Sequence, residues 1–354
     1  MTQEAETATD GVRVVFQAGV KDILVAETQR LGAKNALVLS TPQQSDAALE
    51  MAETLGELAA GVFCQAAMHT PVTVTEAAMA HAKEVAADCI ISIGGGSTIG
   101  LGKAIAYRTG LPQIVIPTTY AGSEATPILG QTENGIKTTL SHPEVLPEVI
   151  LYDPERVATL PVAMTVTSAL NAMAHAAEAL YARDRTEKTV HLAIDGLKAF
   201  VDGLPRVLAA PTDLAARAET QRGAWACGTV LGQVGMALHH KLCHTLGGSF
   251  DLPHAETHSI VLPHAIAYNA RAAATELLPI CDLLGGENAG RALYDFAQKL
   301  GAPLALRDLG LKEEDLDRAA ELATTKPYPN PQPVTRDDIR ALLQAAWAGT
   351  PPAH

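Results

Sequence analysis

The sequence lacks any apolar run of the roughly 20 residues that a membrane-spanning helix needs. It also lacks an excess of basic residues, since 26 Lys and Arg stand against 39 Asp and Glu, a formal net charge of −13. Nucleic acids bind to positively charged surfaces, so this balance argues against a nucleic-acid partner. The polar, acidic first residues, MTQEAETATDG, are unlike a signal peptide, and we expect no membrane association.

Cysteine is scarce and shows no ligand spacing. The five cysteines are odd in number, and none forms a CxxC pair: Cys64, Cys89, Cys227, Cys243 and Cys281. This pattern argues against a disulfide framework and against a zinc ribbon. It predicts reduced thiols in the cytoplasm. Internal repeats and low-complexity tracts are also absent from the sequence.

The first half of the chain alternates short β-branched runs with helical stretches. The expected strands are residues 12–16, 35–40, 61–65, 89–95, 113–119 and 149–153. The expected crossover helices are residues 21–31, 43–58, 72–87 and 98–107. Continuous apolar strands that alternate with helices are typical of a parallel sheet covered on both faces. We therefore predict an α/β domain with a Rossmann-like parallel sheet over residues 1–158.

From Pro161 onward the pattern changes to alanine-rich sequence with a 3.6-residue period. The expected helices are residues 161–181, 187–208, 212–228, 231–246, 257–276, 288–300, 312–324 and 335–347. The proline-rich segment KPYPNPQPVT (326–335) predicts a rigid connector into the last helix, with Thr335 as its N-cap. We predict an all-α domain over residues 159–354.

A glycine-rich turn follows the expected strand at 89–95. The sequence GGGS (94–97) leads directly into a helix, and glycines let backbone N–H groups approach phosphate oxygens closely. It matches neither GxGxxG nor GxxxxGK[ST], and three glycines could form a tight turn without a ligand. A second polar turn, PTTYAGSE (117–124), follows a neighbouring strand. Two such turns at the carboxyl ends of parallel strands favour a bound dinucleotide.

Five of the 12 histidines fall within HHKLCHTLGGSFDLPHAETH (239–258). His240 and His244 are four residues apart, so they share a helix face, and His254 and His258 repeat the interval. We expect Gly247–Gly248 and Pro253 to end the helix between the two pairs. Imidazole can bind a metal or move a proton near neutral pH, so the segment predicts a reaction centre.

These motifs resemble those of the iron-containing (group III) alcohol dehydrogenases. The resemblance rests on GGGS (94–97), PTTYAGSE (117–124), NAMAHAAE (171–178) and the HHKLCH…PH segment (239–254). Within that family the chain is most similar to the maleylacetate reductases, whose GGGSTxGLGKA loop, TTYAGSE turn and HAETH ending it matches. The resemblance implies an active site in the cleft between the two domains, and a homodimer.

The resemblance also assigns roles to residues of the nucleotide turns. Gly95, Gly96 and Ser97 would hold the pyrophosphate, and three further residues would lie along the adenosine and nicotinamide portions: Thr118, Thr119 and Ser123. Thr41 stands where relatives that prefer NAD carry an aspartate, so either NADH or NADPH is expected. Lys137 falls near a family lysine and is a possible partner of a substrate carboxylate.

Metal-dependent members of the family use one aspartate and three histidines, and the corresponding residues here are Asn171, His175, His240 and His254. An amide oxygen carries no charge and binds a divalent ion weakly, so we expect no tightly bound metal. Three histidines could nevertheless capture zinc. A metal-dependent alcohol or polyol dehydrogenase, in which Asn171 remains a ligand, stays open as an alternative, as does a nucleotide-binding sensor without catalysis.

The implied reaction is the NAD(P)H-dependent reduction of the enone double bond of maleylacetate, a small dicarboxylate, to 3-oxoadipate in the degradation of aromatic compounds. His240 and His244 are the strongest candidates for the acid or the oxyanion donor. His175, His254 and His258 are expected to line the substrate site, and Asn171 with them. For His239 and Cys243 we expect packing roles in the core or, for His239, at the surface.

Overall fold

The computed structural model describes residues 4–9 and 11–352, with the side chains of 4–9 excepted. The chain divides into two compact units: the first runs to Leu160 and includes Thr212–Gln221, and the second comprises Pro161–Pro211 and the chain from Arg222 onward. Sequence analysis places the division after residue 158 and assigns 212–221 to the helical domain. The difference arises because Arg217 and Gln221 bind the first unit, through Tyr120 and the carbonyls of Leu160 and Asp153.

The first unit is built on a seven-stranded sheet in the order β1-β2-β9-β6-β5-β3-β4. Its strands are β1 (Glu4–Thr9), β2 (Val12–Phe16), β3 (Ala36–Leu39), β4 (Ala59–Phe63), β5 (Cys89–Gly94), β6 (Gln113–Pro117) and β9 (Val149–Tyr152). All neighbours pair in parallel except β1, which pairs with β2 in antiparallel fashion. The six predicted strands are confirmed, and the predicted α/β class with them.

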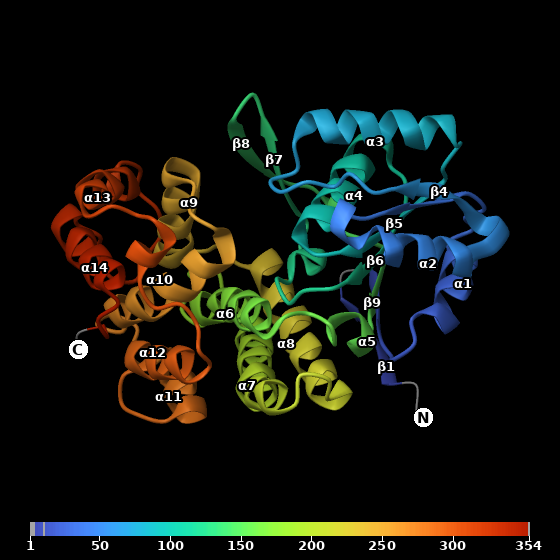
Figure 1. Cartoon of the computed structure of the whole chain (residues 1–354). Helices are drawn as coiled ribbons and strands as arrows, with labels where there is room; N and C mark the ends of the chain where they lie inside the picture. The colour runs from blue at the N-terminus through green and yellow to red at the C-terminus, as the bar shows by residue number, and fades with distance from the viewer. Residues whose placement is uncertain (1–3, 10, 353–354) are drawn as a thin grey trace. The chain divides into compact units, whose positions relative to one another are not determined.

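Helices cover both faces of this sheet (Figure 1). They are α1 (Lys21–Arg30), α2 (Ser45–Leu55), α3 (Val72–Glu84) and α4 (Gly96–Thr109). Alternate residues of β3 contact opposite layers: Val38 packs with Leu24 and Met51 of α1 and α2, whereas Leu37 packs with Leu101 of α4. This alternation explains why the strands read as continuous apolar runs in the sequence.

Several short elements are missing from the sequence-based prediction. These are β1, the hairpin of β7 (Ile128–Glu133) and β8 (Ile136–Ser141), and the helices α5 (Pro154–Val157) and α11 (Leu278–Leu284). Strand β8 is mostly exposed and β7 is mostly half-buried, so neither has a buried apolar run to signal it. The Asn134–Gly135 turn, where both residues have positive φ, was the available signal.

The second unit is helical, as predicted (Figure 1). Its main helices are α6 (Val162–Ala179), α7 (Glu187–Ala209), α9 (Leu238–Phe250), α10 (His254–Asn269), α12 (Ala289–Lys299), α13 (Leu316–Thr324) and α14 (Arg336–Ala348), with α8 (Leu214–Gln233) shared between the units. The N-cap role of Thr335 is confirmed, because its side chain accepts a hydrogen bond from the N–H of Asp338. No helix of the described chain is long and apolar enough to cross a membrane.

The expected helix break at Gly247–Gly248 is wrong. Both glycines lie inside α9, which continues to Phe250 and ends at Asp251 in the left-handed region, with φ of 54°. Two glycines weaken a helix by roughly 1 kcal/mol each, and packing of an apolar face overrides that loss. The apolar face consists of Leu242 and Leu246, which are buried in a core with α10, α13 and α14.

Gly100 and Gly102 allow Thr70 and Ser92 of the first unit to pack closely against α4. A Cβ atom at Gly102 would lie 2.3 Å from Ser92 Oγ, and one at Gly100 would lie 2.3 Å from Thr70 Oγ1. A Cβ atom at Gly96, by contrast, would meet nothing within 4 Å. Gly100 and Gly102 are therefore needed for packing of the first unit, whereas Gly96 leaves the start of the helix open.

The contrast between these glycines predicts the effect of substitution on stability. We expect Gly102→Ala to lower the free energy of unfolding by about 1–3 kcal/mol, because the added methyl overpacks a close contact. Gly96→Ala is the matched control in the same helix and should leave the unfolding free energy nearly unchanged. Adding Ser92→Ala to Gly102→Ala should restore much of the loss. Equal stability of the two single variants in urea denaturation would contradict this packing.

Candidate active site

The turn between β5 and α4 presents an open helix N-terminus. Gly95 is the N-cap of the 14-residue α4, and because it has no side chain it cannot accept the first N–H groups of the helix. Gly96 is exposed. The first N–H groups of a helix have no acceptor within it, and the helix dipole favours an anion at this end. Ser97, half-buried, follows directly. The residues predicted to hold a pyrophosphate thus form an arrangement that fits one.

The second polar turn packs against the first. A Cβ atom at Gly95 would lie 2.9 Å from Thr119 Cγ2, so this glycine is required for the contact. Thr118 is buried; its N–H donates to the Gly94 carbonyl at 3.0 Å, and its Oγ1 accepts from Gln44 Nε2 at 2.9 Å. Ser123 Oγ is buried and has no hydrogen-bond partner in the described structure.

Lys103, which sequence analysis did not single out, holds the second turn in place. Its buried ammonium donates to the carbonyls of Thr126 and Ile128 at 2.7 and 3.0 Å, and also to the carbonyl of Ser123. Burial lowers the pKa of Lys103 to about 7, opposed by the nearby Glu124. Burial likewise raises the pKa of Glu124. The turn is therefore fixed by a buried cation with several acceptors.

Thr41 and Lys137 complete the predicted residues of the first unit. Thr41 follows β3 as the N-cap of a short 3-10 helix (Pro42–Gln44), and its side chain is half-buried. Lys137 lies on β8 of the hairpin and is exposed, although partial burial lowers its pKa. Its contact with a substrate carboxylate stays a prediction.

The second unit carries a polar stripe on α6. Asn171, His175 and Glu178 lie at positions i, i+4 and i+7, so they share one face of the helix. All three are buried, in a helix that is buried from Thr165 to Ala179. Alanines occupy most of the neighbouring positions and let other helices approach closely. The stripe faces α9 and α10 through its contacts with their side chains.

Glu178 binds the first turn of α9. Its Oε1 accepts the N–H of His239 at 2.8 Å and the hydroxyl of Tyr181 at 3.2 Å. Its Oε2 accepts the N–H of Ala237 at 2.9 Å and the Nδ1–H of His240 at 2.7 Å. Burial alone would raise the pKa of Glu178, but these donors, His240 foremost, lower it. The carboxylate is therefore ionised and fully hydrogen-bonded.

A hydrogen-bonded chain runs from Glu178 through His240 to His175. Because a carboxylate only accepts, the Nδ1 of His240 carries a proton, and its Nε2 faces His175 Nδ1 at 2.8 Å. If His240 is neutral, His175 donates to it. If His240 is protonated, it donates to His175, and the proton of His175 is then on Nε2. The chain can thus move a proton between two rings while the carboxylate balances the charge.

A second buried chain joins Cys243, His239 and His258. His239 Nε2 lies 3.1 Å from His258 Nδ1 and 3.6 Å from Cys243 Sγ. Burial, followed by the nearby charges of other histidines, lowers the pKa of His239 and His258 well below 6.5, so both are neutral. Burial raises the pKa of Cys243, which keeps the thiol protonated. His239 therefore has a buried packing role and not a surface one.

Two exposed histidines border the buried ones. His244 has its ring centre 6.2 Å from that of His240, and His254 lies 4.2 Å from His258. The structure thus brings together all five histidines predicted for the site, namely His175, His240, His244, His254 and His258. Sequence analysis missed Glu178, whose signal was a lone acidic residue on the same face as Asn171 and His175.

Three buried polar atoms of this cluster have no hydrogen-bond partner in the described structure: Asn171 Oδ1, His239 Nδ1 and His258 Nε2. Leaving such atoms unsatisfied costs free energy, so a water molecule or a bound ligand is expected to satisfy them. His239, Cys243 and His258 also place ligand-type atoms within 4.8 Å of one another. The cluster therefore contains polar atoms that an ordered water molecule or a small polar ligand would satisfy.

The residues corresponding to the family's metal ligands include a neutral amide, Asn171, among three histidines. Asn171 offers a neutral amide oxygen in place of a carboxylate, so it adds no negative charge to the ligand set. The unsatisfied Asn171 Oδ1 and the carboxylate behind His240 would suit a weakly held ion.

Two family models match this chain. The model described as iron-containing alcohol dehydrogenase matches residues 11–154, and the C-terminal model of the Fe-containing alcohol dehydrogenase family matches residues 165–347. The chain therefore belongs to the iron-containing alcohol dehydrogenase family and is an oxidoreductase.

Individual relatives are similar along nearly their whole length. Maleylacetate reductase from Rhizobium sp. strain MTP-10005 is 59% identical over 97% of this chain and 98% of its own. The enzyme of that name from Burkholderia cepacia is 51% identical over 96% of this chain and 97% of its own. The crystal structure of maleylacetate reductase from Agrobacterium tumefaciens is 58% identical, with a TM-score of 0.95 over 99% of this chain and 100% of that one.

The buried neutral histidines predict a loss of stability in acid. His239, His258 and His264 have lowered pKa values in the fold, that of His264 about 4, mainly through burial. In the unfolded chain each binds a proton near pH 6.5, so the unfolded state gains protons that the folded state does not. The free energy of unfolding is therefore highest above pH 6.5. It decreases as the pH falls below 6.5, by up to about 1.4 kcal/mol per pH unit for each histidine.

Urea unfolding at pH 7.5, 6.5 and 5.5 measures this slope. The variant His264→Phe removes one titrating group outside the cluster and should flatten the slope by about one histidine's share. A pH-independent free energy of unfolding across this range would contradict the neutral state of these rings.

Proposed function

We propose that the chain reduces the carbon–carbon double bond of maleylacetate to give 3-oxoadipate, with NADH or NADPH as reductant. The observation that carries the proposal is the chain of Glu178, His240 and His175, which provides charge compensation and N–H donors without a metal. The similarity to maleylacetate reductases over nearly the whole chain supports the substrate. We further propose a homodimer, which the family resemblance implies, and a cytoplasmic location, which the cysteine pattern predicts.

The first unit would hold the dinucleotide. Gly95, Gly96 and Ser97 would bind the pyrophosphate at the start of α4, and Thr118, Thr119 and Ser123 would lie along the rest of the molecule. The bound reduced nicotinamide supplies the hydride that adds to the substrate carbon β to the ketone. Thr41 leaves room for a 2′-phosphate where an aspartate would repel it, so either cofactor is accepted.

Residues of the second unit would stabilise the negative charge that develops on the substrate and would supply the proton. As the hydride adds to one alkene carbon, the electron pair of the double bond moves to the ketone and makes an enolate oxygen. Histidine N–H groups held by the chain from Glu178 stabilise this oxygen. A proton then goes to the carbon next to the ketone, and we assign this step to His244, which is exposed and can exchange protons with solvent.

The assay for this function follows NADH oxidation with maleylacetate in the presence and absence of a chelator. We expect one NADH consumed per 3-oxoadipate formed, with the rate unchanged by the chelator. Deuteride from C4-labelled NADH should appear on the carbon β to the ketone. Label on the carbinol carbon of an alcohol product, or loss of activity that iron or zinc restores, would instead favour a metal-dependent alcohol dehydrogenase. The observation that favours this second candidate is the unsatisfied Asn171 Oδ1, which is free to bind a metal ion.

Substitution of Glu178 should lower turnover more than substrate binding. We expect Glu178→Gln to reduce kcat by about 100-fold or more, because an amide cannot balance the charge on His240 or accept all four of its donors. His244→Ala should also reduce kcat strongly. NADH affinity should be unchanged in both, since the residues assigned to the cofactor lie in the first unit. Near-normal kcat in a folded Glu178→Gln enzyme would contradict the assigned role.

Restoring a carboxylate at position 171 should raise metal affinity. Asn171→Asp adds a charged oxygen on the same helix face as His175, so iron or zinc occupancy after purification should rise. Elemental analysis measures the occupancy, and Asn171→Ala is the control with no donor atom. Equal metal content in wild type and Asn171→Asp would undercut the proposal that the amide accounts for weak binding.

A further inference from the structure

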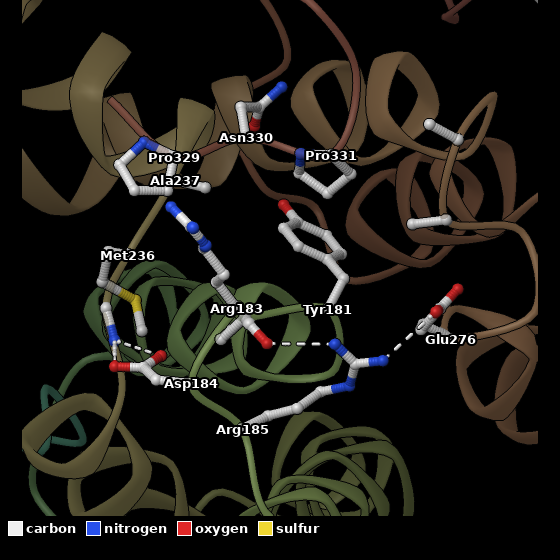
Figure 2. A pocket seen from close by; sticks show the side chains of 14 residues that line it. Tyr181, Arg183, Asp184, Arg185, Met236, Ala237, Glu276, Pro329, Asn330 and Pro331 are labelled. Carbon is white, nitrogen blue, oxygen red and sulfur yellow. Dashed lines mark hydrogen bonds and ion pairs between the residues drawn. The ribbon is translucent and has the colours of Figure 1, made fainter. Parts of the chain in front are cut away.

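A cavity of about 710 Å³ lies in the second unit, and none of the clustered histidines lines it. Four loops form it, and they include residues 181–185, 235–237, 272–273 and 329–331 (Figure 2). We call it the Arg183 cavity. Pockets of this size commonly hold a small organic ligand.

The charges around the Arg183 cavity are paired with one exception. Arg185 donates to the carbonyl of Ala182 at 3.1 Å and to Glu276 at 3.2 Å. Both carboxylate oxygens of Asp184 accept the N–H of Gly235, at 3.0 and 3.1 Å. Arg183 makes no hydrogen bond or ion pair within the described residues, and its guanidinium extends toward Ala237 and Pro329 in Figure 2. An arginine of this kind binds a carboxylate through two parallel hydrogen bonds.

Apart from Asn330, the uncharged lining is mostly apolar. Tyr181 presents an aromatic ring, Pro329 and Pro331 present pyrrolidine rings, and Met236 adds a flexible thioether (Figure 2). Such surfaces pack well against a planar ring. The combination of one unpaired guanidinium with flat apolar walls fits an aromatic carboxylate better than an aliphatic anion.

Two residues that line the Arg183 cavity also bind Glu178, the hydrogen-bond partner of His240. Tyr181 donates its hydroxyl to Glu178 Oε1, and Ala237 donates its N–H to Glu178 Oε2, the atom that also binds His240. Asn330 accepts the N–H of Leu238 at 3.3 Å and so binds the same turn of α9. A ligand that shifts the loop of Tyr181 or that of Ala237 therefore changes the hydrogen bonds of Glu178, which holds the His240 ring.

We propose that the Arg183 cavity binds an aromatic carboxylate, and that binding changes the turnover number of the enzyme through Glu178. The effect on turnover rests on the proposed function, whereas the binding does not. An enzyme that acts late in the breakdown of aromatic rings would sense by this means an acid from an earlier stage.

Calorimetry with benzoate tests the binding on the full chain without substrate. We expect saturable binding to the wild type, weakened about tenfold or more in Arg183→Met, which keeps the length of the side chain and removes its charge. Arg318→Met is the matched control, since Arg318 is an exposed arginine of α13 far along the chain, paired with Glu321. Acetate and benzyl alcohol, which lack the ring or the charge, should bind much more weakly. Absent binding, or equal affinity in Arg183→Met, would overturn the site.

Steady-state kinetics then tests the connection to His240. Benzoate should change kcat with little change in the KM for maleylacetate, and the change should be smaller in Tyr181→Phe, which still binds benzoate but lacks the hydroxyl that donates to Glu178. Inhibition that only raises KM would show benzoate in the substrate site and would overturn the connection. If calorimetry detects benzoate while maleylacetate is not reduced, the proposed function fails and the site stands.

Discussion

The candidate active site depends on one buried carboxylate. Glu178 accepts two N–H groups from the start of α9, a hydroxyl, and the Nδ1–H of His240, so it uses both oxygens. It thereby fixes the position of the helix and the tautomer of the ring at once. Removing one partner from a buried charged network costs about 3–5 kcal/mol, because the other charge is left without compensation. The helix dipole of α9 adds to this, since its positive end faces the carboxylate.

This constraint also bears on the position that corresponds to the family's aspartate ligand. With Asn171 in place of an aspartate, the face of α6 toward the histidines has one negative charge fewer. The remaining charge, Glu178, binds Nδ1 of His240, whereas Nε2 of the same ring faces His175. A positive charge on the His240 and His175 pair would then be balanced by Glu178, as the proposed reaction requires.

Much of the fold could be predicted from the sequence, because the buried strands are continuous apolar runs and the helices have a 3.6-residue period. The hairpin of β7 and β8 and the continuation of α9 through Gly247–Gly248 could not, since the first has no apolar signal and the second depends on packing with α10, α13 and α14. The five site histidines were predictable from spacing and from the resemblance. The role of Glu178 was not, because its burial and its contact with Nδ1 of His240 are set by packing between helices distant in sequence.

The tautomer of His240 tests the central interaction most directly. Nuclear magnetic resonance of protein labelled with ¹⁵N in histidine can observe the proton on Nδ1 of His240, assigned by comparison with His240→Gln. A proton bound to Nδ1 and shifted far downfield, present from pH 6 to 8 and lost in Glu178→Gln, is the predicted result. A His240 ring protonated only on Nε2, or a signal unaffected by Glu178→Gln, would contradict it.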